Sequence, residues 1–151
     1  MLRRPPPPAG GSGLLAMTVC AMTVKNNMVK TLKSLSILFW LGIIFISSNI
    51  PVSYDDPDRQ RVIWEYLYDK SMHLLLFGIL SYLIISFLVE YKKLKFYHIA
   101  IVAVLFTYFY GITDEWHQGF IAGRGVSYYD LLFDVFGAIF GVIVYKVFQK
   151  K

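Results

Sequence analysis

The chain has 151 residues, of which 56% are apolar and 17% are charged, and its mean hydropathy is +0.52. The apolar residues lie in long blocks and not at the spacing of a soluble core, which argues against a soluble domain and indicates a membrane protein. The net charge of +5 comes without a basic stripe interleaved with exposed aromatics, so nucleic acid is not an expected partner, and the single cysteine, Cys20, excludes an internal disulfide framework.

Residues 1–33 precede the first long apolar run and are predicted to form a separate N-terminal tail. They contain a proline run at 5–8, a Gly-Gly-Ser-Gly segment at 10–13 and a short apolar stretch at 14–24. The stretch mimics a signal peptide, but the residues before Lys25 lack the small side chains of a cleavage site. We therefore expect residues 1–33 to be disordered, or the first 27 to be included by a start codon placed upstream of Met28.

Four membrane-spanning helices are predicted in the rest of the chain. Three are uncharged runs at residues 34–50, 71–89 and 96–113, and the fourth, at 131–148, carries only Asp134 and Lys146. A hydrocarbon core about 30 Å thick needs about 20 helical residues, with about 17 to 25 workable. The expected fold is all-α, a polytopic membrane protein with a four-transmembrane-helix bundle over residues 34–151.

The distribution of charge predicts the topology. Eleven of the 15 basic residues lie before the first span, between the second and third spans, or at the end of the fourth. Because basic residues are retained in the cytoplasm during insertion, both termini are expected to be cytoplasmic in a multi-pass protein of the cell membrane. Nine of the ten acidic residues fall on the opposite side, so we expect the functional face to be extracytoplasmic.

Polar motifs stand at the outer ends of the second and third spans. Asp69-Lys70-x-x-His73 leads into the second span, where helical spacing would place the three side chains on one side of the helix. Asp114-Glu115-x-x-Gln118 ends the third span, and helical spacing pairs each of its two acids with Gln118.

The start of the fourth span combines a turn, a cap and a polar stripe. A glycine-flanked turn carries Arg124, and Ser127 is a plausible N-cap three residues before Asp130. The spacing of Asp130, Asp134, Gly137 and Gly141 forms one stripe that must face protein, and Gly137-x-x-x-Gly141 permits close approach of another helix. A carboxylate within a span needs a partner, and His73 or Arg124 is expected to be the partner of Asp134.

The charges of these motifs do not balance. Five carboxyl groups (Asp69, Asp114, Glu115, Asp130 and Asp134) face two cations (Lys70 and Arg124), a surplus of three negative charges. Either some carboxyl groups are protonated, or His73 and His117 are, or a cation binds. A metal site would draw on Asp114, Glu115, His73 and His117, but no His-Glu-x-x-His spacing is present, and the sequence predicts neither a metal nor another cofactor.

Taken together, the motifs resemble those of the VanZ-like family. They are, in chain order, Ser48 and Pro51, Asp69-Lys70-x-x-His73, Asp114-Glu115-x-x-Gln118, Arg124-x-x-Ser127-x-x-Asp130 and Gly137-x-x-x-Gly141. The resemblance covers about residues 34–148 and implies a bacterial membrane protein associated with low-level resistance to teicoplanin, with little effect on vancomycin. It also implies a functional cluster made of nine polar residues: Asp69, Lys70, His73, Asp114, Glu115, Gln118, Arg124, Ser127 and Asp130. Two departures are Asp134, where the family commonly has asparagine, and Ala122-Gly123, where Pro-Gly often precedes the arginine.

Three functions fit these residues. In the first, the external acidic site acts on or shields a lipid-linked surface molecule, such as a cell-wall precursor or the lipid anchor of a lipoglycopeptide. In the second, the protein is an enzyme in which Glu115 or Asp114 is a general acid or base with His73 as its partner. Arg124 would then bind an oxyanion or a phosphate group of the substrate. In the third, the cluster only fixes helix packing in a structural scaffold. Catalysis and oligomeric state are left open, and membrane lipid is the expected surrounding partner.

Overall fold

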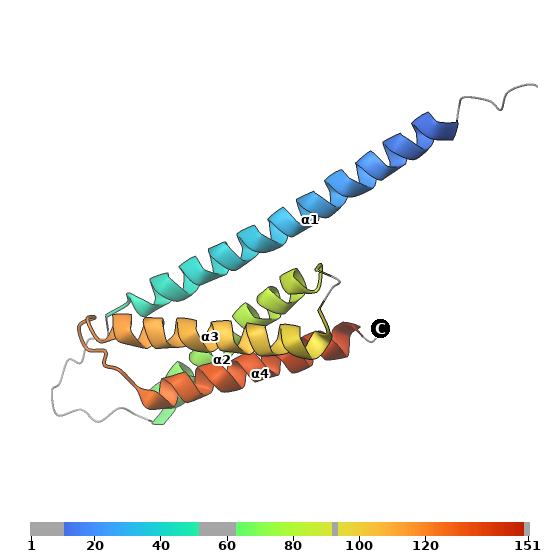
Figure 1. Cartoon of the computed structure of the whole chain (residues 1–151). Coiled ribbons are helices and arrows are strands. Elements are labelled where there is room, and N and C mark those ends of the chain that lie inside the picture. The colour runs from blue at the N-terminus through green and yellow to red at the C-terminus, as the bar shows by residue number, and fades with distance from the viewer. Residues whose placement is uncertain (1–10, 52–62, 92–93, 150–151) are drawn as a thin grey trace, which may run out of the picture. The chain divides into compact units, whose positions relative to one another are not determined.

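Four α-helices make up nearly all of the described part of the chain. The computed structural model describes residues 11–51, 63–91 and 94–149, with helices α1 (Gly11–Ser48), α2 (Ile63–Leu88), α3 (Phe96–Gln118) and α4 (Tyr128–Gln149) (Figure 1). The described residues contain no strand. Each helix is long and apolar enough to cross a membrane, which confirms the predicted all-α fold with four spans.

The N-terminal region differs from the expectation of disorder. The chain divides into two units, residues 1–32 and 33–151, and the described residues 11–32 of the first unit are helical. No proline or glycine occurs between residues 14 and 41, so nothing in that sequence interrupts a helix. The first ten residues lie outside the described part, and the assignment of 1–33 as a separate tail stays a prediction.

Glycines bring α2 and α4 into close contact. A Cβ atom at Gly137 would collide with the carbonyl oxygen of Leu74, and one at Gly141 with the carbonyl oxygen of Gly78. A Cβ at Gly78 would in turn lie 3.1 Å from the carbonyl oxygen of Gly137. The glycine stripe of the fourth span therefore faces protein as predicted, and it lets two backbones pack without intervening side chains.

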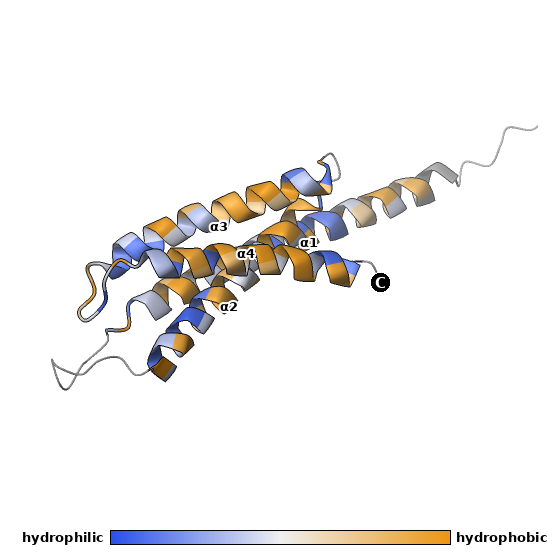
Figure 2. Cartoon of the chain, turned by 90° about the horizontal axis from the view of Figure 1, so that it is seen from below, coloured by the Kyte–Doolittle hydropathy of each residue, from blue (hydrophilic) through white to orange (hydrophobic). Residues whose placement is uncertain are grey.

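The second unit has a small apolar core and an apolar outer surface. Its buried apolar side chains include Ile44, Phe77, Leu80 and Ile85. Most other large apolar side chains of α3 and α4 are exposed, as expected for helices surrounded by lipid. Figure 2 shows apolar residues along the middle of α2, α3 and α4 and hydrophilic residues towards their ends.

Side-chain hydrogen bonds to backbone carbonyls connect α1 to its neighbours. The Trp40 indole Nε1 donates to the carbonyl oxygen of Leu76 at 2.8 Å, and the Tyr110 hydroxyl donates to the carbonyl oxygen of Leu41 at 3.0 Å. About two turns before Trp40 in α1, Lys33 forms an ion pair with Glu90. Residues 33–41 of α1 are thereby held against the helices that carry the polar motifs.

Candidate functional site

The predicted site residues come together where the end of α1 and the end of α3 meet the first turns of α2 and α4. We call them the polar cluster: Ser48, Asp69, Lys70, His73, Asp114, Glu115, Gln118, Arg124, Ser127, Asp130 and Asp134. All are buried except Asp69, Arg124 and Ser127, which are partly buried. Most buried polar groups in proteins are hydrogen-bonded, so each contact in the cluster bears on its stability.

Asp114 is held by a network across α1 and α3. The Ser48 hydroxyl donates to its Oδ1 at 2.5 Å, and the Gln118 amide donates to its Oδ2 at 2.9 Å. The expected pair of Asp114 and Gln118 is therefore present, whereas Glu115 makes a different contact. Both oxygens of Asp114 are engaged, which makes this carboxylate a poor candidate for the acid or base of a reaction.

Arg124 fastens the turn between α3 and α4 to the end of α1. Its Nη1 donates to the Gln118 side-chain oxygen at 3.1 Å, its Nε to the Ile50 carbonyl oxygen at 3.0 Å, and its Nη2 to the Ser47 carbonyl oxygen at 3.3 Å. The two carbonyl acceptors were not foreseen from the sequence. No side chain in the sequence signals them, because every residue has a carbonyl group.

The glycine before Arg124 has a conformation that other residues adopt at a cost. Gly123 has a φ of 75°, and a left-handed conformation costs a non-glycine residue roughly 1–2 kcal/mol. We expect Gly123→Ala to lower the free energy of unfolding in detergent by about 1 kcal/mol. Gly125→Ala is the matched control, because a Cβ there meets nothing within 4 Å. Equal thermal stability of the two variants would contradict the account.

Glu115 caps the start of α4 from a neighbouring helix. Its Oε2 accepts a hydrogen bond from the Ser127 backbone N–H at 2.7 Å, while the Asp130 backbone N–H donates to the Ser127 hydroxyl at 3.3 Å. Ser127 is thus an N-cap, as its spacing predicts. Its hydroxyl is occupied by that contact, which argues against a role as nucleophile.

An ion pair and a contact between a histidine and a carboxylate connect α2 with α4. The Lys70 ammonium contacts Asp130 and also donates to Asp69 at 3.1 Å. The His73 Nδ1 lies 2.9 Å from the Asp134 Oδ1, so His73, and not Arg124, is the partner of the carboxylate inside the span. These contacts give Asp130 and Asp134 a partner each, but the second oxygen of Asp134 has no hydrogen-bond partner among the described residues.

A cavity of about 300 Å³ opens beside the cluster. His73, Asp69, Asp114, Gln118 and Arg124 give it a polar wall. Its apolar wall is formed by Ile50, Met72, Leu76 and Phe77, together with the ring of Tyr68. A cavity with both kinds of wall can hold a molecule that has a polar part and an apolar part.

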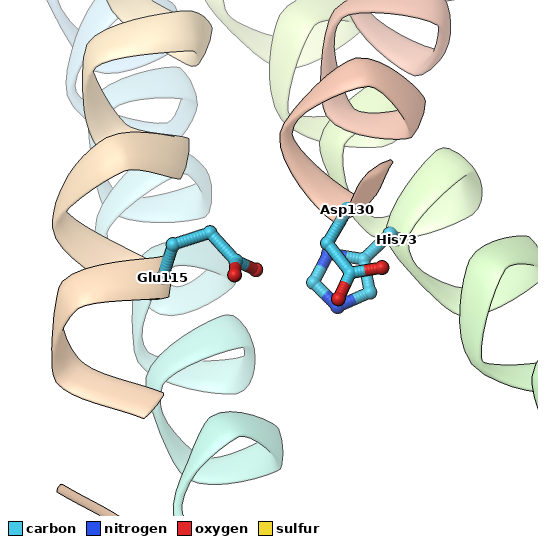
Figure 3. A group of neighbouring side chains, drawn as sticks. All are labelled: His73, Glu115 and Asp130. Atoms are coloured by element: carbon cyan, nitrogen blue, oxygen red, sulfur yellow. The ribbon is translucent and has the colours of Figure 1, made fainter. Parts of the chain in front are cut away.

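One group of side chains has the composition of a metal site. His73, Glu115 and Asp130 each offer a ligand atom, and these atoms all lie within 4.8 Å of one another (Figure 3). His117 is elsewhere, stacked on Phe45 with its Nε2 3.2 Å from the Asn49 side-chain oxygen. Of the four ligands named from the sequence, only His73 and Glu115 belong to this group.

The comparison with known families decides the relationship that the motifs indicate. A profile of the VanZ/LLP1 family matches residues 25–149. The chain belongs to the VanZ/LLP1 family. No curated protein and no solved structure matches it. The resemblance derived from the polar motifs is thereby confirmed, and it covers the four spans of this VanZ/LLP1 protein.

The two departures of this VanZ/LLP1 chain have local explanations. Asp134 is completely buried and pairs with His73, so its additional charge is placed opposite a histidine. Gly123 retains the left-handed conformation of the turn although Ala122 precedes it. The turn therefore keeps Arg124 within reach of α1 without the proline.

Proposed function

We propose that this VanZ/LLP1 membrane protein binds the polar end of a lipid-linked molecule of the cell envelope and thereby gives low-level resistance to teicoplanin-type lipoglycopeptides. The cavity beside the polar cluster carries the proposal, because its polar and apolar walls meet at the ends of the spans. Its volume of about 300 Å³ suits a headgroup or part of an acyl chain. A whole glycopeptide is far larger, so the guest is a lipid-linked precursor or the lipid anchor of the antibiotic.

The groups that the cavity offers to a guest follow from the contacts already made. Both oxygens of Asp114 are used within the protein. Arginine carries five N–H donors, and each of the three nitrogens of Arg124 uses one in the contacts above, which leaves two. Arg124 therefore provides donors for phosphate or hydroxyl groups, while Leu76 and Phe77 offer an apolar surface for a lipid chain.

The side of the membrane follows from the positive-inside rule. Lys33 and Glu90 form their ion pair at the helix ends that lie next to the basic segments of the sequence. The polar cluster lies at the opposite ends of the helices. With the basic segments in the cytoplasm, the cavity opens on the extracytoplasmic side, where lipid-linked precursors and glycopeptides meet.

Drug susceptibility tests the proposal directly. A sensitive Gram-positive host would express the wild type, Arg124→Lys or Glu90→Gln at matched membrane levels, with teicoplanin and vancomycin tested side by side. We expect reduced susceptibility to teicoplanin alone, lost in Arg124→Lys because lysine lacks the five directed N–H donors of the guanidinium, and kept in Glu90→Gln. No shift with the well-expressed wild type would remove resistance as the function.

A second candidate, catalysis on the same lipid-linked molecule, is favoured by the pair of His73 and Asp134. A histidine on the wall of a cavity with a carboxylate on its Nδ1 has the arrangement of a general base. Mass spectrometry of lipid extracts from the same host would separate the two functions. A lipid species altered by the wild type, but not by His73→Gln, would favour the enzyme.

A further inference from the structure

Two deeply buried carboxylate oxygens in the polar cluster have no hydrogen-bond partner among the described residues. They are Oε1 of Glu115 and Oδ2 of Asp134, and these residues are 4% and 0% exposed. An unsatisfied buried polar group costs about 1–3 kcal/mol, and more when it is charged. Native proteins keep few such groups, and an ion is one of the standard reasons for keeping them.

The charge of the cluster points to the sign of the missing partner. Asp69, Asp114, Glu115, Asp130 and Asp134 face the cations of only two residues, Lys70 and Arg124. A divalent cation would reduce the surplus of three negative charges to one. Because four of the five carboxyl groups are buried, the interaction with such a cation would be weakly screened.

The side chains that could hold a cation converge from three helices. His73 comes from α2, Glu115 from α3 and Asp130 from α4, and Figure 3 shows the carboxyl group of Glu115 directed towards the other two side chains. The unpartnered Oε1 belongs to one of these three residues. The Oε2 of Glu115 accepts a hydrogen bond from the Ser127 backbone N–H, and the Oδ1 of Asp130 accepts one from Lys70. Each carboxylate therefore has one anchored oxygen and one oxygen left for a ligand bond.

Asp134 orients the histidine in the manner of an outer-sphere residue. Its Oδ1 lies 2.9 Å from the His73 Nδ1, and a proton there leaves the lone pair on Nε2. Metal-binding histidines commonly donate their second nitrogen to a carboxylate, which fixes the ring and raises its basicity. The buried carboxylate inside the fourth span thereby acquires a role that a packing network alone does not require.

We propose that His73, Glu115 and Asp130 bind one divalent transition-metal ion, with Asp134 as the positioning residue for His73. One imidazole nitrogen and two carboxylate oxygens suit Zn²⁺ better than Mg²⁺, which prefers oxygen ligands and water. Ligand atoms about 2.1 Å from Zn²⁺ lie roughly 3.4 Å apart in a tetrahedron, so the three donors, which lie within 4.8 Å of one another, need to approach by at most about 1.4 Å.

Zn²⁺ binding to the purified full-length protein in detergent tests the proposal. After removal of metal with EDTA and desalting, equilibrium dialysis against Zn²⁺ measures stoichiometry and affinity. We expect one tight equivalent, at least about tenfold weaker in Glu115→Gln and about 10- to 100-fold weaker in Asp134→Asn. His117→Gln, which removes an imidazole outside the group, should bind as the wild type does.

A second readout does not depend on how well the ligand variants fold, because it uses only the wild type and the control variant. Zn²⁺ should raise the unfolding temperature of the wild type and of His117→Gln, because a ligand that binds only the folded state stabilises it. Absence of a stoichiometric site in the wild type, equal loss in His117→Gln, or displacement of Zn²⁺ by equimolar Mg²⁺ would overturn the assignment. The measurement uses no antibiotic, so its failure and that of the resistance proposal are distinguishable.

Discussion

Lys70→Met is expected to lower the free energy of unfolding in detergent by about 3–5 kcal/mol, because it leaves Asp130 as an uncompensated buried charge. Both side chains of this pair are less than a tenth exposed. Breaking one partner of a buried pair costs more than the pair itself contributes. Removing both charges should therefore restore most of the stability, and we expect Lys70→Met with Asp130→Asn to unfold at a temperature close to that of the wild type.

The same chain offers a matched control for this experiment. Lys33 and Glu90 also form an ion pair, but their side chains are 29% and 35% exposed. Partly exposed pairs contribute at most about 1 kcal/mol, so Lys33→Met should be mild. Equal losses in Lys33→Met and Lys70→Met, or no recovery in the double variant, would refute the explanation based on burial.

Gly141→Ala is expected to destabilise the contact between α2 and α4 by about 1–3 kcal/mol, and Gly137→Ala by a similar amount. In both variants the new methyl group meets a backbone carbonyl, of Gly78 or Leu74, and a backbone cannot move aside as a flexible side chain can. Thermal unfolding in detergent, followed by intrinsic tryptophan fluorescence, measures the effect. The expected result is a lower unfolding temperature for each variant.

A third glycine provides the control for helix propensity. At Gly42, in α1, a Cβ meets nothing within 4 Å, so Gly42→Ala should leave the protein unchanged or slightly more stable. If Gly42→Ala were as destabilising as Gly141→Ala, the lower stability would come from the change of glycine to alanine in a membrane helix. The close approach of α2 and α4 would then not be its cause.

Local spacing predicted those parts of the fold and site that depend on one helix. The four spans follow from runs of apolar residues, and the pair of Asp114 and Gln118 follows from helical spacing. The cap formed by Ser127 and the protein-facing stripe that ends at Gly141 follow in the same way. Each of these features is set by neighbours in sequence, so the residue pattern contains the information.

Contacts between helices could be predicted only as alternatives. The sequence offered His73 or Arg124 as the partner of Asp134, and only the packing of α2 against α4 selects His73. Glu115 was expected beside Gln118 on its own helix, but it accepts a hydrogen bond from the Ser127 backbone across the bundle. A carboxylate can reach several donors from one helical position, and the arrangement of neighbouring helices decides which one it meets.

Other contacts were missed although signals existed. Lys33 and Glu90 are opposite charges at span ends assigned to the same side of the membrane, which makes an ion pair possible. The carbonyl acceptors of Trp40 and Tyr110 carry no such signal, because every residue has a carbonyl group. Side-chain bonds to the backbone therefore have to be observed in three dimensions.

The pairing of α2 with α4 has a consequence for biosynthesis. A polytopic protein enters the membrane one helix after another as the ribosome delivers it, and α3 lies between these two helices in the chain. When α2 leaves the translocon, neither Asp130 nor Asp134 has been inserted, so Lys70 and His73 lack the partners they have in the finished bundle. The contacts of Lys70 and His73 with α4 can therefore form only after the fourth helix is made, and assembly is completed by the last span.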